Sequence, residues 1–174
     1  MPLLSRATAI LATPRSEWAL IERERTAPAT LLVSYVAILA AIPAVAGFIG
    51  RSLVGAYTPV MPSLLRAVVV YLAAFAIVYV VASIIDLLAP RFGGKKNFDN
   101  AFKLSVYAHT PLWLAGVFLL VPGLHFLIIL GLYGVYLLWL GLPLLMDVPP
   151  YRVLPYAIIA ASCALVPAVV LALI

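Results

Sequence analysis

The side chains of this sequence best suited to chemistry are three polar residues within apolar runs. Asp86 lies four residues before Pro90, and Lys103 and His109 lie six residues apart in the next apolar run. A charged carboxylate in hydrocarbon costs about 2.5–3.5 kcal/mol at mid-membrane, so it requires a cation or a donor. We therefore expect Asp86 to pair with Lys103 or His109. The alternative is an aspartate that reaches the headgroup region and binds only water; a proton relay would need further titratable groups.

A proline interrupts the same apolar run. Tyr107-Ala108-His109-Thr110-Pro111 places the proline near the middle of an expected helix, where it removes one backbone hydrogen bond. A break in a membrane helix can turn polar groups toward a cavity. The candidate intramembrane polar pair and kink comprises Asp86, Lys103, Tyr107, His109, Thr110 and Pro111.

A basic loop with aromatic residues precedes this run. Cations next to a membrane gain about 1 kcal/mol each near anionic lipid, and aromatic rings anchor at headgroup depth. We therefore expect contact with anionic headgroups; the alternative is that the lysines only set the orientation of the chain. The candidate lipid- or partner-binding loop comprises Arg91, Phe92, Gly93, Gly94, Lys95, Lys96 and Phe98.

Motifs of enzymes and cofactor sites are missing from the sequence. It has no zinc helix, nucleophile elbow or nucleotide fingerprint, and His109 and His125 have no evident third metal ligand. The single cysteine, Cys163, excludes an intrachain disulfide. We expect a non-catalytic protein without cofactor or metal. The net charge of +5 does not indicate nucleic-acid binding, because the basic residues flank the apolar runs.

Composition determines the elements that position these residues. With 66% hydrophobic residues, 10% charged residues and a mean hydropathy of +1.19, the chain requires lipid as its solvent. A helix needs about 20 mostly apolar residues to cross a membrane. We predict an all-α bundle of five transmembrane helices. The expected spans are 29–50, 62–89, 101–121, 124–146 and 151–174.

Residues 1–28 form a short amphipathic lead-in to this transmembrane domain of residues 29–174. Trp18 and Ile21 share one side of an expected helix that begins after Thr13-Pro14. Such a helix either lies in the headgroup plane or packs on a cytoplasmic loop. The distribution of lysine and arginine favours a cytoplasmic N-terminus and an outside C-terminus in a multi-pass membrane protein.

Span five has a small residue at every fourth position. This spacing lets helix backbones approach closely, because lipid provides no hydrophobic drive for association. We therefore predict a buried packing face made of Ala160, Ala164, Ala168 and Ala172.

The order of these features resembles the Yip family, the Ypt/Rab-interacting integral membrane proteins, in its short bacterial form. The similar parts are the Thr13–Ile21 lead-in, the Phe92–Lys95 loop, the Tyr107–Pro111 motif and the Pro122-Gly123 turn, followed by a glycine-containing fourth span. The resemblance implies five spans with a cytoplasmic N-terminus. Eukaryotic members act in vesicle traffic through small GTPases, but this chain lacks their long soluble N-terminal region and its acidic-Leu-Tyr-Gly-Pro motif. That difference argues against a small GTPase partner.

Two functions fit these observations. The first is a membrane-organising or adaptor protein that acts through membrane lipids, copies of itself or other membrane proteins. The second is a small transporter or permeation subunit that uses the polar groups of spans two and three. Functional polar sites in membranes normally need several partners, which favours the first.

Overall fold

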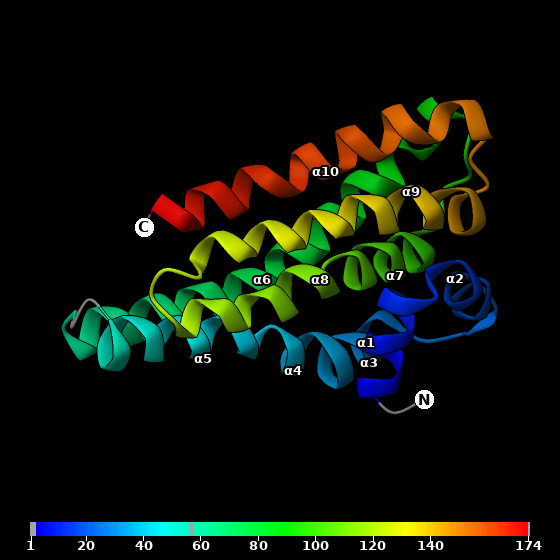
Figure 1. Ribbon diagram of the computed structural model, residues 1–174. Helices are drawn as coiled ribbons and strands as arrows, with labels where there is room; N and C mark the ends of the chain where they lie inside the picture. The colour runs from blue at the N-terminus through cyan, green and yellow to red at the C-terminus, as the bar shows by residue number, and fades with distance from the viewer. Residues whose placement is uncertain (1–2, 56–57, 174) are drawn as a thin grey trace.

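The computed structural model of the protein describes residues 3–55 and 58–173, with side chains described as far as Ala164. Within these residues every regular element is a helix, short loops and turns connect the helices, and there is no strand. Long helices run side by side between two ends of a bundle (Figure 1). The N-terminal helices lie at one end, which we call the lead-in end. The same end includes the Arg91–Phe98 loop and the turn between α9 and α10.

The bounds of the elements follow the expected spans closely. The α-helices are α1 Leu3–Ala12, α2 Pro14–Arg23, α3 Pro28–Leu31, α4 Ala37–Leu39, α5 Ala41–Ile49, α6 Val60–Leu88, α7 Phe98–Ala108, α8 Thr110–Ala115, α9 Tyr133–Met146 and α10 Pro150–Leu173. The π-helical segments are η1 Leu32–Val36 and η2 Gly50–Val54, and the 3-10 segments are η3 Ala89–Phe92, η4 Gly116–Leu120 and η5 His125–Leu132.

Three of the expected spans coincide with helices that are long and apolar enough to cross a membrane. These helices are Pro28–Val54, Val60–Phe92 and His125–Met146. The other two expected spans are also helical but do not meet that criterion within the described residues. Expected span 101–121 is divided at His109 into α7 and the α8–η4 segment, and expected span 151–174 corresponds to α10. Over residues 3–55 and 58–173, the structure thus shows an all-helical fold with three helices of membrane-crossing length and composition.

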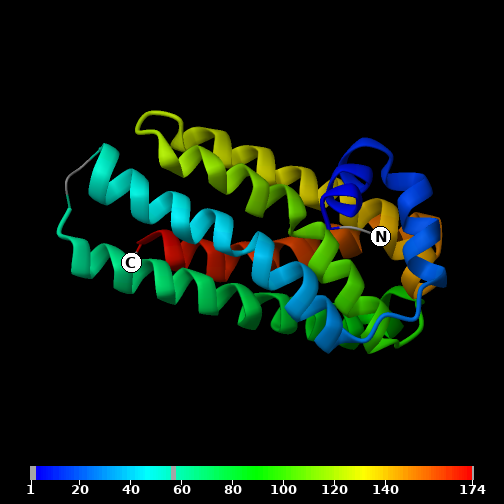
Figure 2. The same ribbon diagram turned by 90° about the horizontal axis from the view of Figure 1, so that it is seen from below.

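The helices pack as a ring of neighbours. Helix α5 lies between α6 and η4, and α7 lies between α6 and α9 (Figure 2). Helix α10 returns from the lead-in end along α6 and α9. One continuous apolar core joins these helices to the N-terminal lead-in. The residues of the candidate sites therefore come from elements that share one core.

Three glycines on one side of the fourth span set its distance from α7 and α8. A Cβ atom on Gly134 would lie 2.2 Å from the carbonyl oxygen of Ala108, and one on Gly131 would lie 2.7 Å from Leu112. A Cβ atom on Gly141 would meet Leu104 at 2.5 Å. Small residues permit this close backbone approach. Gly134 thereby accommodates the last residue of α7, directly before the break at His109.

The lead-in docks onto the bundle instead of lying apart from it. Helix α2 packs against α9, and the side chains of Trp18 and Ile21 are wholly buried. The Trp18 ring lies over Gly141, where a Cβ atom would come within 2.9 Å of the indole. This docking is closer than either arrangement expected from the sequence, because the glycine leaves room for the indole.

Candidate functional site

A buried ion cluster joins the two lead-in helices. Arg6 of α1 donates to Glu17 of α2 at 2.5 Å and also pairs with Glu24 directly after α2. Arg6 and Glu17 are 5% and 3% exposed. Burial alone would lower the pKa of the Arg6 guanidinium, but its hydrogen bond with Glu24 and the nearby carboxylates raise that pKa overall. The guanidinium stays charged and fixes α1 against α2.

Lys103 connects this cluster to the transmembrane helices. Its ammonium donates to the backbone carbonyls of Glu24 at 2.5 Å and Ile21 at 3.3 Å, and to Oδ1 of Asn100 at 3.4 Å. These carbonyls belong to the C-terminal end of α2, where the helix dipole favours a cation. Lys103 is only 4% exposed. Lys103 therefore caps the C-terminal end of α2 and does not form a polar site within the membrane interior.

The predicted pairing of Asp86 is wrong for both partners. In the described part of the chain, Asp86 forms no ion pair with Lys103 or His109, and its buried Oδ1 has no hydrogen-bond partner. The spacing of these residues along their helices does not determine the direction in which their side chains point. Lys103 turns toward the lead-in, and the residue next to Asp86, Ile85, accepts a hydrogen bond from Tyr156 of α10.

The residues of the predicted kink do lie together, in a buried aromatic column. The Tyr107 ring makes edge contacts with Trp18 at 6.1 Å and with Tyr35 at 5.0 Å between centroids. The Tyr35 hydroxyl lies 2.9 Å from Oγ1 of Thr110. His109 Nδ1 donates to the Ser105 carbonyl at 2.7 Å. The column thus joins the lead-in, the first span and the α7–α8 break.

The basic loop is held in place by backbone hydrogen bonds. The Gly94 amide donates to Ala89 at 2.8 Å, and the Lys95 amide donates to Met146 at the end of α9 at 2.9 Å. Gly93 adopts a left-handed conformation with φ +77°, which favours glycine. A Cβ atom on Gly94 would lie 2.6 Å from the Met146 carbonyl oxygen. The glycine pair therefore lets the loop lie directly on the end of α9.

Four exposed cations gather on this loop and the adjacent turn. Arg152 of α10 donates to the Arg91 carbonyl at 3.5 Å, which brings a fourth cation next to the three predicted ones. Lys95 pairs with Asp147 at 2.9 Å, and this hydrogen bond raises the pKa of the exposed lysine. We call the group the basic end surface. It comprises Arg91, Lys95, Lys96 and Arg152.

The predicted anchoring role of the two phenylalanines is not supported by their positions. Phe92 stacks on Tyr156 at 4.6 Å with an interplanar angle of 2°, and Phe98 packs on Tyr79 and Phe102. Both rings are partly buried and cover apolar helix surface. The exposed ring of this region is Tyr151, which is 75% exposed.

Comparison with known families gives one match, and it covers nearly the whole chain. The Yip1 domain family matches residues 8–173. The chain belongs to the Yip1-domain family. No curated protein sequence and no solved structure gives a significant match. Membership of the Yip1-domain family, together with the three long apolar helices, makes the chain an integral membrane protein.

The small-residue face of this Yip1-domain protein lies on α10. Ala160 is wholly buried, and Ala164 is partly buried and packs against the core. The side chains of Ala168 and Ala172 lie outside the described residues. The buried part of the face continues from Tyr156 and Ala157, one turn before Ala160.

Sequence reasoning missed four charged residues of the site. Arg6, Glu17, Glu24 and Arg152 are absent from the sites expected from the sequence. The available signal was the presence of both arginines and glutamates within one short amphipathic segment, where opposite charges can pair. Among the described residues, no group of three histidine, cysteine, aspartate or glutamate side chains could hold a metal ion.

Proposed function

We propose that this Yip1-domain protein is a non-catalytic membrane-organising or adaptor protein that works through contacts with lipid and with other membrane helices. The observation that supports this proposal is the basic end surface. Its cations come from two separate segments, the Arg91–Phe98 loop and the start of α10, and backbone hydrogen bonds fix the loop in place. A fixed set of exposed cations suits the phosphates of anionic lipid headgroups.

We extend the proposal to a five-span topology with the lead-in end in the cytoplasm. The α7–α8–η4 segment and α10 would supply the two spans beyond the three long apolar helices. The cations of the basic end surface and those of the lead-in lie at one end of the bundle, as expected for a cytoplasmic face. The localisation that fits is a plasma membrane of the bacterial inner-membrane kind.

The proposal does not extend to transport. A permeation path through spans two and three would need polar groups that face a cavity. Two grooves on the described part of the chain are apolar, and neither is lined by Asp86 or His109. The ammonium of Lys103 donates to three protein oxygens. These contacts suit a structural role in a closed bundle.

The experiment is a comparison of anionic lipid association in matched charge variants. The protein is reconstituted in nanodiscs of phosphatidylcholine with a small share of phosphatidylglycerol, and the phospholipid retained after mild detergent extraction is quantified by mass spectrometry. The double variant Lys96→Gln/Arg152→Gln should lower the amount of retained phosphatidylglycerol about 30-fold. The reason is that each cation contributes about 1 kcal/mol to the free energy of association with anionic lipid.

The matched control is Arg23→Gln/Arg25→Gln, which removes two exposed cations from the lead-in. This variant has the same net charge and should retain phosphatidylglycerol much as the unmodified protein does. Equal loss in both double variants would mean that net charge alone attracts the lipid, and the basic end surface would then have no special role.

A further inference from the structure

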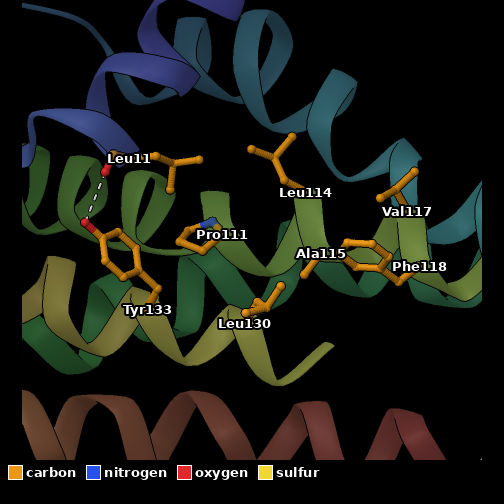
Figure 3. A pocket seen from close by; sticks show the side chains of 8 residues that line it. All are labelled: Leu11, Pro111, Leu114, Ala115, Val117, Phe118, Leu130 and Tyr133. Atoms are coloured by element: carbon orange, nitrogen blue, oxygen red, sulfur yellow. Dashed lines mark hydrogen bonds between the residues drawn. The ribbon is translucent and has the colours of Figure 1, made fainter. Parts of the chain in front are cut away.

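An apolar groove runs along the outside of the α8–η5 region, beneath the end of α1. Its volume is about 460 Å³. In Figure 3, Leu11 and Tyr133 lie at one end of the groove, Phe118 at the other, and Leu130 along one side. Part of its wall comes from 3-10 segments, in which side chains three residues apart are eclipsed and stand in rows. The groove is therefore elongated and lined by carbon.

The lining excludes a polar ligand. The one side-chain oxygen in it belongs to Tyr133, and this hydroxyl already donates to the Leu11 carbonyl at 3.1 Å. A polar group placed along the groove would lose its water partners without gaining a protein partner. The chemistry that fits is a hydrocarbon chain.

The groove opens onto surface that faces lipid. Residues on and around η5 are exposed and apolar: Phe126 is 66% exposed, Ile129 61% and Leu130 53%. They belong to the His125–Met146 helix, one of the three helices apolar and long enough to cross a membrane. An open groove on such a helix meets acyl chains instead of water.

The direction of the bound molecule follows from an aromatic row on α9. The rings of Tyr133, Tyr136 and Trp139 follow one another at 5.3 and 5.9 Å, and each is more than a third exposed. Tyrosine and tryptophan favour headgroup depth, and this row leads from the groove toward the lead-in end. The head of an amphiphile therefore belongs at the Tyr133 end and its tail toward Phe118.

We propose that this groove binds one acyl chain of a membrane phospholipid, with the phosphate at the Tyr133 end. The inference deepens the proposed function, because it gives lipid contact a defined site on the protein. The chain would lie against both the lead-in, through Leu11, and the helix after the α7–α8 break, through Pro111 and Leu114. Lipid bound there would stabilise the docked lead-in.

The test uses phosphatidylglycerol with a diazirine midway along one acyl chain, present as a minor component of nanodiscs that contain the full chain. After irradiation, adducts are mapped by mass spectrometry. Labelling of Leu114, Phe118 and Leu130 should exceed labelling of the exposed α6 residues Leu65 and Leu72 by about fivefold or more. Equal labelling of the groove and α6 would overturn the site, because it would mean that bulk lipid only solvates the groove.

The second part of the test uses variants in which a larger side chain fills the groove. Leu130→Trp adds bulk at the half-exposed rim and should return Phe118 labelling to the α6 level. Leu72→Trp, the same change on α6, should leave it unaltered. If Leu130→Trp does not fold, Val117→Phe is the alternative, because Val117 also lies at the rim of the groove and is 48% exposed. Phe118 labelling that survives both fillings contradicts the proposal.

The same labelling separates this site from the proposed function. Lys96→Gln/Arg152→Gln should lose retained phosphatidylglycerol but keep the groove adducts. Uniform labelling together with an effect of the charge variant would overturn the groove alone. Groove adducts together with no effect of the charge variant would overturn the basic end surface alone.

Discussion

The ammonium of Lys103 and the backbone carbonyl of Glu24 lie 2.5 Å apart, so that a lysine of α7 caps the end of α2. This contact makes the lead-in part of the membrane bundle. The first prediction follows from it. Lys103→Met keeps the length of the side chain and removes its donors, which should lower the free energy of unfolding by about 1.5–3 kcal/mol. Thermal unfolding in detergent measures the change.

The control for this variant is Lys96→Met, because Lys96 is exposed, whereas Lys103 is buried. It should leave the melting temperature within the error of the measurement. A Lys103→Met protein as stable as Lys96→Met would mean that the lead-in does not depend on this cap.

The second prediction concerns the buried ion pair of Arg6 and Glu17. Glu17→Leu leaves Arg6 with only the partly exposed Glu24 and should cost about 3–5 kcal/mol, because an uncompensated buried charge is expensive. Arg6→Met/Glu17→Leu should be less destabilised than Glu17→Leu alone, since it removes both buried charges. Urea titration followed by intrinsic tryptophan fluorescence, to which the buried Trp18 of the lead-in contributes, would measure the loss.

Glu22→Leu is the reference for this pair, as Glu22 is exposed on the same helix. Its effect should stay near zero. Additive losses for Arg6→Met and Glu17→Leu would contradict the coupling between the two residues.

The third prediction tests the close approach at the α7–α8 break. Gly134→Ala puts a methyl group 2.2 Å from the Ala108 carbonyl oxygen. Because this oxygen belongs to the backbone, a helix would have to shift to relieve the clash. The cost should be about 1–3 kcal/mol or more, as for other overpacked sites. Gly47→Ala is the matched variant in span one, where the methyl group meets only the end of the Arg51 side chain at 3.3 Å. It should be close to neutral in the same thermal assay.

The fourth prediction tests the proposed topology. In a Cys163→Ala background, Lys96→Cys reports the lead-in end and Met61→Cys reports the opposite end at the start of α6. Both positions are exposed. In intact cells, a membrane-impermeant maleimide should label Met61→Cys and leave Lys96→Cys unlabelled until the membrane is permeabilised. The reverse pattern would invert the orientation, and equal labelling would exclude a crossing by α6.

Periodicity and proline positions predicted most of the fold. The break before Pro111 and the approximate bounds of α6 and of the η5–α9 segment follow from a fixed φ, a missing amide and the length of apolar runs, all of which are local properties. These features need no knowledge of which helices are neighbours.

The partners of the polar residues could not be predicted in the same way. Height along a helix placed Asp86 and Lys103 at similar depth, but the direction in which each side chain points depends on which helix packs beside it. The backbone carbonyls of Ile21 and Glu24 in the lead-in accept hydrogen bonds from Lys103, and no sequence motif indicates backbone acceptors of this kind. Phe92 likewise stacks on the ring of Tyr156 in α10 and does not anchor in the headgroup layer. Each of these contacts depends on packing between segments that are far apart in the sequence.

The docking of the lead-in also sets an order of assembly. Lys103 comes 79 residues after Glu24, and Gly141, which makes room for Trp18, belongs to the fourth span. During synthesis, α1 and α2 leave the ribosome long before either docking partner exists. The lead-in is therefore made before its docking partners and reaches its place after them, and the lead-in end closes only after α9 has entered the membrane.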